Sequence, residues 1–492
     1  MFDFKHAQKA SLAHKEIICD NLTPLSILSA TKARVLLESA YNETGKDRYS
    51  LVVLNEAFRI YKDKMGQHLI ANGRKVPLKE ALKGYKQAHN WDFSHDFLYS
   101  LSLVRSLAPN PQGRLPSHLP LPLGGAGYIG YEFFAEIEEI DFTNPPLYDA
   151  PECAFIFGRD FLIFDHLFDR LHIVSVSYAH EREQINPQAR IEHIMSLLEG
   201  IPRLDSIHTD EPVEDFTIID ATSASEYEAV VERIKAHIYA GDLLQCVPSQ
   251  SMQVHSSLSP LQAYRHLRFQ NPSPYMFYYD FDDFVVLGAS PEIMIRLKTH
   301  NERSFFTLRP IAGTRARGEN MVQDLALEEE LLRDEKENAE HLMLLDLARN
   351  DAGKVSVGGG VKVLARNQVE RYSRVMHIVS EVQGELDSKI YAKRDAFKSV
   401  FPAGTLSGAP KIEAIKTIEA LESTARGIYG GAIGYFTYDE DMDFAIAIRT
   451  AVYQNGIYYL RSGAGVVQDS IPAKEYIETQ SKVRSMLDML CK

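Results

Sequence analysis

Two pairs of glutamates, each pair spaced by three residues, stand in segments with a helical pattern. Glu337 and Glu340 lie in KENAEHLMLLDLARND, and Glu475 and Glu478 lie in PAKEYIETQSKVR, where Lys482 extends the same face. Side chains three residues apart share one face of a helix, so each pair brings two like charges together. Solvated helix faces would explain such pairs. So would a hard cation such as Mg²⁺, which takes one or two carboxylates and completes its shell with water and substrate oxygens.

Three glycine-containing segments could hold an anion. Residues 461–467, RSGAGVV, place two glycines directly after a strand-like run, so backbone N–H groups can approach a carboxylate or phosphate without interference from a Cβ atom. Residues 310–315, PIAGTR, and 403–411, AGTLSGAPK, share a Gly-Thr pair that offers a hydroxyl beside an exposed amide. The GAPK end of the latter segment is expected to open a helix, whose N-terminus adds positive potential.

Arg449 lies in an apolar run, DFAIAIRTAV, which we predict to be one strand over Asp443–Val452. A guanidinium in such a strand needs a partner, because an unpaired buried charge is costly. A substrate carboxylate bound by two parallel hydrogen bonds would supply that partner, and so would an internal ion pair with Asp or Glu. The strand alone leaves both explanations open.

The segment Gly125-Ala-Gly127-Tyr-Ile-Gly130 fits the G-x-G-x-x-G pattern of dinucleotide-binding loops. That fingerprint requires a buried strand before it and a helix after it within a βαβ unit. Here HLPLPLG precedes it, and its prolines argue against a central strand. We therefore expect a glycine-rich turn and no dinucleotide.

Composition limits the class of protein. The chain has 492 residues, a net charge of −14, 45% hydrophobic and 24% charged residues, and four cysteines. These contents exclude disorder of the whole chain, and the negative charge disfavours nucleic acid as a main partner. The cysteines are widely spaced with no C-x-x-C pair, and no stretch approaches the roughly 18 apolar residues of a membrane span. A cytoplasmic location is expected.

The elements that must position these residues follow from periodicity. Helices are predicted at 187–198, 224–240, 335–350, 394–401, 409–422 and 473–490, and strands at 50–54, 161–164, 276–279, 284–287, 292–297, 431–437, 443–452 and 456–462. The hairpin-like spacing of the last three strands favours antiparallel pairing, so the fold class is α+β. We predict an N-terminal region over 1–205, a linker over 206–222 and a catalytic region over 223–492.

From about Tyr227 to Leu487 many separate segments occur in a recognisable order. They include GDLLQCVPSQ, NPSPYMFYY, LGASPE, PIAGTRARG, ENAEHLMLLDLARND, AGTLSGAPK, AIAIRTAV and RSGAGVVQDSIPAKEYIET. In this order they resemble the chorismate-binding enzymes, most closely the large synthase subunits of anthranilate synthases. The resemblance implies an antiparallel β-sandwich core with flanking helices. It also implies the substrate chorismate, a ring dicarboxylate with an enolpyruvyl ether, and the cofactor Mg²⁺.

The resemblance assigns the binding residues. Glu340 and Glu478 match the metal ligands, and Glu337 and Glu475 match glutamates that support the metal through water. The residues that match chorismate contacts are Gly313, Thr314, Tyr429, Arg449, Gly463, Ala464, Gly465 and Lys482. Arg449, Tyr429 and the amides of 463–465 would hold the enolpyruvyl carboxylate.

The resemblance also implies a two-step reaction. Ammonia attacks ring C2 while the C4 hydroxyl leaves, which gives 2-amino-2-deoxyisochorismate; loss of the C2 proton and of pyruvate then gives anthranilate. Glu292 matches the general acid, and its apolar neighbours are expected to keep it protonated near neutral pH. His377 matches the residue of the second step, although a histidine in RVMHIVSEV taken alone is more often structural. Thr405 matches a threonine that lines the same cavity.

Two positions distinguish the chain from other members of the family. Isochorismate-forming members carry a water-activating lysine where this chain has Gln245, and aminodeoxychorismate synthases commonly carry a lysine where it has Ala312. Direct attack by ammonia is therefore expected. Two alternatives stay open: an aminodeoxychorismate synthase, which would release no pyruvate, and a non-catalytic tryptophan-binding protein of the same fold.

Partners and regulation follow from the same resemblance. No Gly-x-Cys-x-Gly elbow is present, so ammonia is expected from a separate glutamine amidotransferase subunit, in a heterotetramer of two large and two small subunits. LLES at 36–39 and NPSPYM at 271–276 resemble the two segments that bind tryptophan as a feedback inhibitor. Ser39, Pro274, Tyr275 and Met276 match the contacts. The resemblance thus implies the first step of tryptophan biosynthesis.

Overall fold

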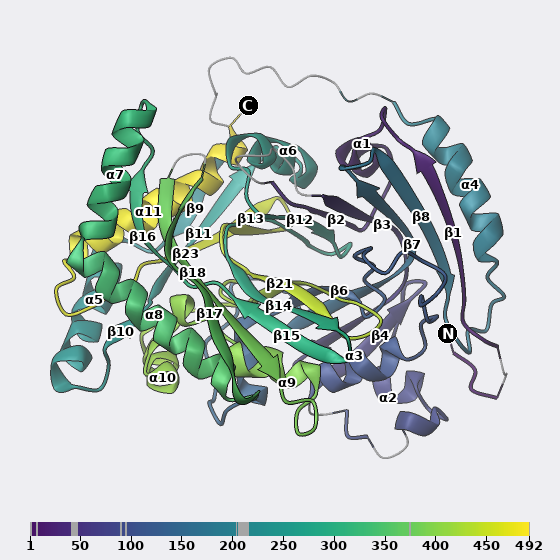
Figure 1. Ribbon diagram of the computed structural model, residues 1–492, viewed down its shortest axis with the longest axis horizontal. Helices are drawn as coiled ribbons and strands as arrows, with labels where there is room; N and C mark the ends of the chain where they lie inside the picture. Colours follow the sequence, from purple (N-terminus) through teal and green to yellow (C-terminus); the bar gives the residue numbers. More distant parts are fainter. Residues whose placement is uncertain are drawn as a thin grey trace.

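Two long antiparallel strands, β3 (Tyr49–Asp63) and β7 (Cys153–Asp165), connect two layers of sheet (Figure 1). Their pairing register shifts at three places between Val53 and Phe58, which bends both strands. Before the bend β3 pairs with β2 (Val35–Glu38), and after it with β4 (Gly66–Ala71). The computed structural model describes residues 2–5, 8–40, 48–88, 91–93, 96–202, 204, 216–372 and 375–491.

The first layer continues from β3 and β2 through strands of the C-terminal half. In spatial order these are β12 (Tyr275–Asp280), β13 (Val285–Ser290), β22 (Thr450–Gln454), β23 (Ile457–Gly463), β11 (Ser249–Ser256) and β9 (Phe216–Ala221). On the other side, β7 pairs with β8 (Arg170–Ser177) and β8 with β1 (Ser11–Ile18). Every one of these pairings is antiparallel.

The second layer continues from the other ends of β3 and β7. On the β7 side it runs through β6 (Ala126–Ile129), β20 (Ala432–Phe436), β21 (Met442–Ile446), β14 (Ile293–His300), β15 (Arg303–Leu308) and β18 (Val375–Leu386). β18 also pairs with β16 (Ile311–Ala316) and β17 (Ser356–Arg371), and β4 pairs with β5 (Arg74–Pro77). Residues of the 1–205 and 223–492 ranges therefore share one hydrogen-bonded system.

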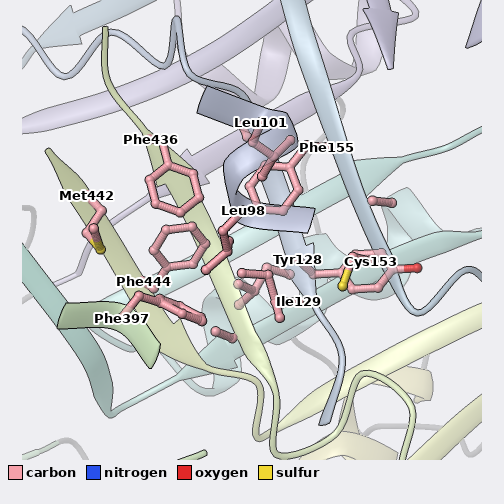
Figure 2. Close-up of a cluster of buried hydrophobic side chains, with 14 of the residues drawn as sticks. Leu98, Leu101, Tyr128, Ile129, Cys153, Phe155, Phe397, Phe436, Met442 and Phe444 are labelled. Carbon is pink, nitrogen blue, oxygen red and sulfur yellow. The ribbon is translucent and has the colours of Figure 1, made fainter. Parts of the chain in front are cut away.

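The main core lies between the two layers. One apolar cluster contains Phe277 and Val286 of the first layer together with Ile295 and Phe444 of the second. Figure 2 shows the part of this cluster around Phe444, whose ring lies 4.8 Å from that of Phe436 and 5.4 Å from that of Phe397. The predicted antiparallel β-sandwich with flanking helices is confirmed.

Helices cover the outer faces. A second apolar cluster joins the first layer to α1 (Pro24–Ala30), α4 (Pro187–Glu199), α6 (Pro260–Gln270) and α11 (Pro472–Leu487). α8 (Glu335–Gly353) contacts β16, β17 and β18, α7 (Met321–Arg333) contacts β16, and α5 (Ala224–Ala240) contacts α11. The remaining helices are α2 (Leu78–Ala81), α3 (Phe97–Arg105), α9 (Lys393–Val400) and α10 (Lys411–Leu421). Among the described helices none is long and apolar enough to cross a membrane.

Two local expectations were wrong. The G-x-G-x-x-G segment is the buried strand β6 and not a turn, because its glycines let the neighbouring backbone approach: a Cβ atom on Gly127 would lie 1.9 Å from the carbonyl oxygen of Ala154. The run Asp443–Val452 forms two strands, β21 and β22, with a break before Thr450. Of the predicted linker, residues 206–215 lie outside the described residues, and Phe216–Ala221 forms β9.

Candidate active site

Glu292 follows β13 and directly precedes β14, where its backbone is held by β21. Its carbonyl accepts from the N–H of Ile446 at 3.0 Å, and the hydroxyl of Thr405 donates to its Oε1 at 3.0 Å. Burial raises the pKa of Glu292 to about 8. The carboxyl group therefore holds a proton at neutral pH, as its apolar neighbours led us to expect.

His377 lies in β18 opposite Thr314 of β16. Its Nδ1 is 3.0 Å from the carbonyl oxygen of Gly313 and 3.0 Å from the hydroxyl oxygen of Thr314. A carbonyl can only accept, so Nδ1 carries the ring proton and Nε2 is left as the acceptor. Burial lowers the pKa of His377 to about 4, which keeps the ring neutral. A neutral imidazole with an open Nε2 can take up a proton.

Gly313 creates the bulge that aims this carbonyl. The register between β16 and β18 shifts between Ala312 and Thr314, and Gly313 has a φ of 72°. That conformation is one that residues with a Cβ rarely adopt. A Cβ atom there would also lie 3.2 Å from Leu331 and 3.3 Å from the carboxylate of Glu337. The bulge thus brings β16, α7 and α8 together beside His377.

Arg449 lies in the break between β21 and β22, and not inside one strand as predicted. It has a φ of 47°, and its carbonyl accepts from the N–H of Ala289 at 3.0 Å. Burial lowers the pKa of its guanidinium, and its titratable neighbours are Tyr372 and Glu292. Within the described ranges its side chain has no hydrogen bond or ion pair, so the internal ion pair considered above is not found. The guanidinium is open to an anionic ligand.

The glycine segment at the end of β23 lies beside Tyr429, Lys482 and Gln245. A Cβ atom on Gly463 would lie 3.0 Å from the hydroxyl of Tyr429, and the carbonyl of Gly463 accepts from Nζ of Lys482 at 2.8 Å. A Cβ atom on Gly465 would lie 2.8 Å from Nε2 of Gln245. Only glycine fits at positions 463 and 465. Ala464 between them is fully buried, and its backbone N–H donates a hydrogen bond to the hydroxyl oxygen of Tyr227.

The four glutamates lie close enough to influence one another. Burial raises the pKa of Glu340, and the charges of Glu337 and Glu478 raise it further. Burial likewise raises the pKa of Glu475, to which Glu478 adds. Glu340 accepts from Nε2 of Gln245 at 3.2 Å. Two helices, α8 and α11, thus bring their carboxylates to one place.

These carboxylates suit a magnesium ion that is bound by only one or two protein groups. No group of three or more His, Cys, Asp or Glu side chains in the described part of the chain is arranged to hold a metal by itself. Glu337 accepts from Arg315 at 3.2 Å, and Glu478 pairs with Lys482 at 2.8 Å. Mg²⁺ needs only one or two carboxylates when water and substrate oxygens complete its shell. Glu340 and Glu478 are a donor set of that kind.

The two segments expected to bind tryptophan lie side by side. β2 pairs with β12 so that Glu38 faces Met276, and the N–H of Ala40 donates to the carbonyl of Ser273 at 3.1 Å. Ser39 and Pro274 are therefore neighbours across this pairing. Met276 is buried, and the hydroxyl of Tyr275 donates to Asp443 at 2.9 Å.

Sequence reasoning missed two contributors. Arg315 bonds Glu337, Asp334 and Glu330 and so fixes the start of α8. Tyr372 packs edge-on against His377, with ring centroids 5.4 Å apart, and interacts electrostatically with Arg449. Arg315 directly follows the Gly-Thr pair, which is a signal that could have found it. Tyr372 lies only five residues before His377, but no local pattern encodes its interaction with Arg449, which is far away in the sequence.

Comparison with known proteins agrees with this geometry. The family of chorismate binding enzymes matches residues 55–488. Anthranilate synthase component 1 from Neisseria meningitidis serogroup B is 40% identical over 96% of this chain and 93% of its own length, and the protein of that name from Pseudomonas aeruginosa has the same identity and coverage.

Solved structures give the same result. The crystal structure of anthranilate synthase component I from Streptococcus pneumoniae has a TM-score of 0.75 and 34% identity, over 90% of this chain and 92% of that one. The menaquinone-specific isochorismate synthase from Escherichia coli, with a TM-score of 0.68, 16% identity and coverage of 98% and 96%, shares the fold. The chain is thus an enzyme that belongs to the chorismate-binding family, among the anthranilate synthase component 1 proteins.

Proposed function

We propose that the chain converts chorismate and ammonia to anthranilate and pyruvate, as the first step of tryptophan biosynthesis. One observation carries the proposal: a protonated acid, a neutral base and an unpaired guanidinium share one site. The charges of Arg449 and Lys482 act on both Glu292 and His377, so the four groups lie within electrostatic reach of each other. A site for a dianionic substrate that loses a hydroxyl and then a proton needs these groups.

The first step is amination at ring C2. Arg449 binds the enolpyruvyl carboxylate, and Tyr429 and the backbone at 463–465 complete its pocket. Glu292 gives its proton to the C4 hydroxyl, which leaves as water while ammonia bonds to C2 and the two ring double bonds shift. The ammonium group formed at C2 then releases one proton. Gln245 cannot deprotonate water, because a carboxamide is not a base at neutral pH. Ammonia, already a nucleophile, needs no such base.

The second step is aromatisation. Nε2 of His377 accepts the proton of C2. Nδ1–H meanwhile keeps its hydrogen bond to the carbonyl of Gly313, which holds the ring in position. The electron pair of the broken C–H bond enters the ring, the bond between ring C3 and the ether oxygen breaks, and enolpyruvate leaves with that oxygen. Enolpyruvate takes up one proton at its methylene carbon, which balances the proton taken by His377, and becomes pyruvate; anthranilate remains.

Mg²⁺ belongs to the proposal as the cofactor. Glu340 and Glu478 would hold it, with Glu337 and Glu475 acting through water. The ion would neutralise the charge that the ring carboxylate meets among four glutamates. Without it, carboxylates whose pKa values are already raised by burial and mutual repulsion would repel the substrate.

The ammonia source in the proposal is a glutamine amidotransferase subunit, in a heterotetramer of two large and two small subunits. All four cysteines of this chain are buried and none forms a disulfide, which leaves no exposed thiol to attack glutamine. Cysteines outside disulfides also suit the cytoplasm, which we propose as the location.

Tryptophan is the proposed feedback inhibitor. The pairing of β2 with β12, in which Glu38 faces Met276 and the N–H of Ala40 donates to the carbonyl of Ser273, brings the segments that carry Ser39 and Pro274 together and supports this part. A hydroxyl and a buried thioether offer polar and apolar contacts to an indole amino acid.

The test is a reaction of the purified chain with chorismate, MgCl₂ and an ammonium salt at mildly alkaline pH. Anthranilate fluorescence and pyruvate should appear together, and EDTA should abolish both. Glutamine without the partner should give neither. An aminated product without pyruvate would identify an aminodeoxychorismate synthase, and tryptophan binding without consumption of chorismate would identify a binding protein.

A further inference from the structure

A cavity adjoins the active site and has Glu292 and Thr405 in its wall. Its other polar lining residues are Asp351 and Arg309, and none of the residues proposed to hold chorismate by its carboxylates or to ligate Mg²⁺ lines it. Glu292 thus lines this cavity and also lies within electrostatic reach of Arg449 and Lys482, which are proposed to bind the substrate.

Helix α8 forms one side of this cavity. The face that carries Glu337 and Glu340 continues, at helical spacing, through Leu344 and Ala348 to Asp351, and these last three line the cavity. Opposite α8, Gly404 packs so closely that a Cβ atom there would lie 2.1 Å from Leu347. The cavity is therefore a narrow space between α8 and the segment that carries Thr405.

Charged groups stand at the far end of the cavity from Glu292. Asp351 accepts from Nζ of Lys411 at 2.8 Å and from Nζ of Lys354 at 3.0 Å. Lys411 is buried, whereas the side chain of Lys354 is 51% exposed. Arg309 pairs with Glu370 and Glu381 on the neighbouring strands. The carboxyl group of Glu292, the hydroxyl of Thr405 and the carboxylate of Asp351 give water in this cavity polar partners, which a purely apolar cavity lacks.

The proposed reaction has a use for such a space. In every turnover Glu292 gives one proton to the C4 hydroxyl, the C4–O bond breaks, and one water molecule and a carboxylate are left. The ammonium group formed at C2 releases one proton, so the reaction consumes no proton overall, but that proton is lost at C2 and Glu292 must regain one at its own carboxylate before it can act again. Arg449 and Lys482, the cations that act on Glu292 from the site, are the groups proposed to hold chorismate, so bound substrate would occupy that side of Glu292.

We propose that the cavity lined by Glu292, Thr405, Ala348 and Asp351 is the route by which solvent returns a proton to Glu292 and takes up the water lost from C4. Thr405 is the first relay, since its hydroxyl donates to Oε1 of Glu292 and can accept from a water in the cavity. Asp351 and the lysines around it keep the outer end hydrated. This inference rests on the proposed function and adds a path to it.

The test fills the cavity without touching the site. Ala348→Leu adds three carbons on the cavity face of α8 and keeps a strong helix former. Ala348→Ser, the control, keeps the volume of the cavity. Both variants and the unmodified chain are mixed with chorismate, MgCl₂ and an ammonium salt at pH 7, and pyruvate is followed by quenched flow from the first turnover onward.

Glu292 begins the first turnover protonated, so that turnover needs no proton from the cavity. For Ala348→Leu we expect the first turnover at the rate of the unmodified chain, followed by a steady state slower by about ten-fold, and slower again in D₂O. Ala348→Ser should show no such break. A steady state of Ala348→Leu equal to that of the unmodified chain would overturn the inference, and so would an equal loss in both phases. If the unmodified chain forms no anthranilate, the proposed function itself has failed and the inference falls with it.

Discussion

At the scale of single residues, the environment of each side chain decides its chemistry. Glu292 is buried and Glu340 half-buried, but Glu292 has one neutral donor and the cations Arg449 and Lys482 within reach, whereas Glu340 lies among like charges on two helices. The first is suited to hold a proton and the second to hold a cation. The sequence reveals the residue types. The raised pKa of Glu292 and the lack of an ion-pair partner for Arg449 among the described residues depend on the packing around these side chains, so the sequence alone could not give them.

The pH dependence of activity tests Glu292. An acid must be protonated to act, so activity should fall as the pH rises through about 8, the pKa that burial gives Glu292. Thr405→Val removes a hydrogen bond that lowers this pKa, and the alkaline limb of kcat should therefore move to higher pH. Glu292→Gln should lose about 10²- to 10⁴-fold in kcat and lose the limb. An alkaline limb that persists in Glu292→Gln would assign it to another group.

Truncation of Arg449 tests carboxylate binding. Arg449→Gln removes the charge, and kcat/KM for chorismate should fall about 10²-fold, or about 3 kcal/mol, mostly through KM. Arg449→Lys keeps the charge but loses the paired hydrogen bonds, so its loss should be smaller. Steady-state kinetics with saturating ammonium salt measures both. An unchanged KM in Arg449→Gln would place the carboxylate elsewhere.

At the scale of elements, local signals placed the ends of the predicted helices well and strand ends poorly, and α1, α2, α3, α6 and α7 were not predicted. The predicted helix 224–240 agrees with α5 at both ends, because Ser223 and Glu226 form a capping box and Gly241 closes the helix in a left-handed conformation. The run Asp443–Val452 gave no sign of its break, since the φ of 47° at Arg449 is imposed by tertiary contacts. Strand β6 was missed because its glycines predict a turn when the strand that packs closely against them is unknown.

The bulge in β16 can be tested with a matched glycine. Gly313 and Gly73 have φ values of 72° and 70°, but a Cβ atom on Gly73 would meet nothing within 4 Å. Gly73→Ala should therefore cost about 1 to 2 kcal/mol of stability from backbone strain and leave turnover unchanged. Gly313→Ala should cost more and also lower kcat, because its carbonyl orients His377. Urea unfolding and kinetics measure the two effects. Equal stability losses and equal turnover would show that the bulge has no catalytic consequence.

The pairing of β2 with β12 can be tested through inhibition. Ser39→Phe places a ring beside Pro274 and Met276, and tryptophan should inhibit this variant much less than the unmodified chain. Lys32→Phe, at an exposed position near β2 but outside the pairing, should be inhibited normally. Inhibition curves at fixed chorismate provide the measurement. If Ser39→Phe keeps full sensitivity, tryptophan does not bind at this pairing.

At the scale of the whole molecule, the two layers depend on each other. Residues of the site come from both: Glu292, Thr314 and His377 lie in or beside the second layer, whereas Gly463 ends a strand of the first. The family, the α+β class and the sandwich could be predicted from the sequence because motifs in the C-terminal half carry them. The joining of the layers through bends in β3 and β7 could not, because no residue pattern marks where a strand passes from one layer to another.

The pairing of β6 with β20 has a consequence for biosynthesis. Gly127 of β6 faces Gly434 of β20, so one edge of β6 has no partner until roughly 300 further residues have been made, which takes about 15 to 60 s at ordinary translation rates. β2 likewise waits for β12. During that time the nascent chain exposes open strand edges and the apolar faces of an unfinished sandwich. The N-terminal third therefore cannot complete these pairings on the ribosome until the later strands have been made.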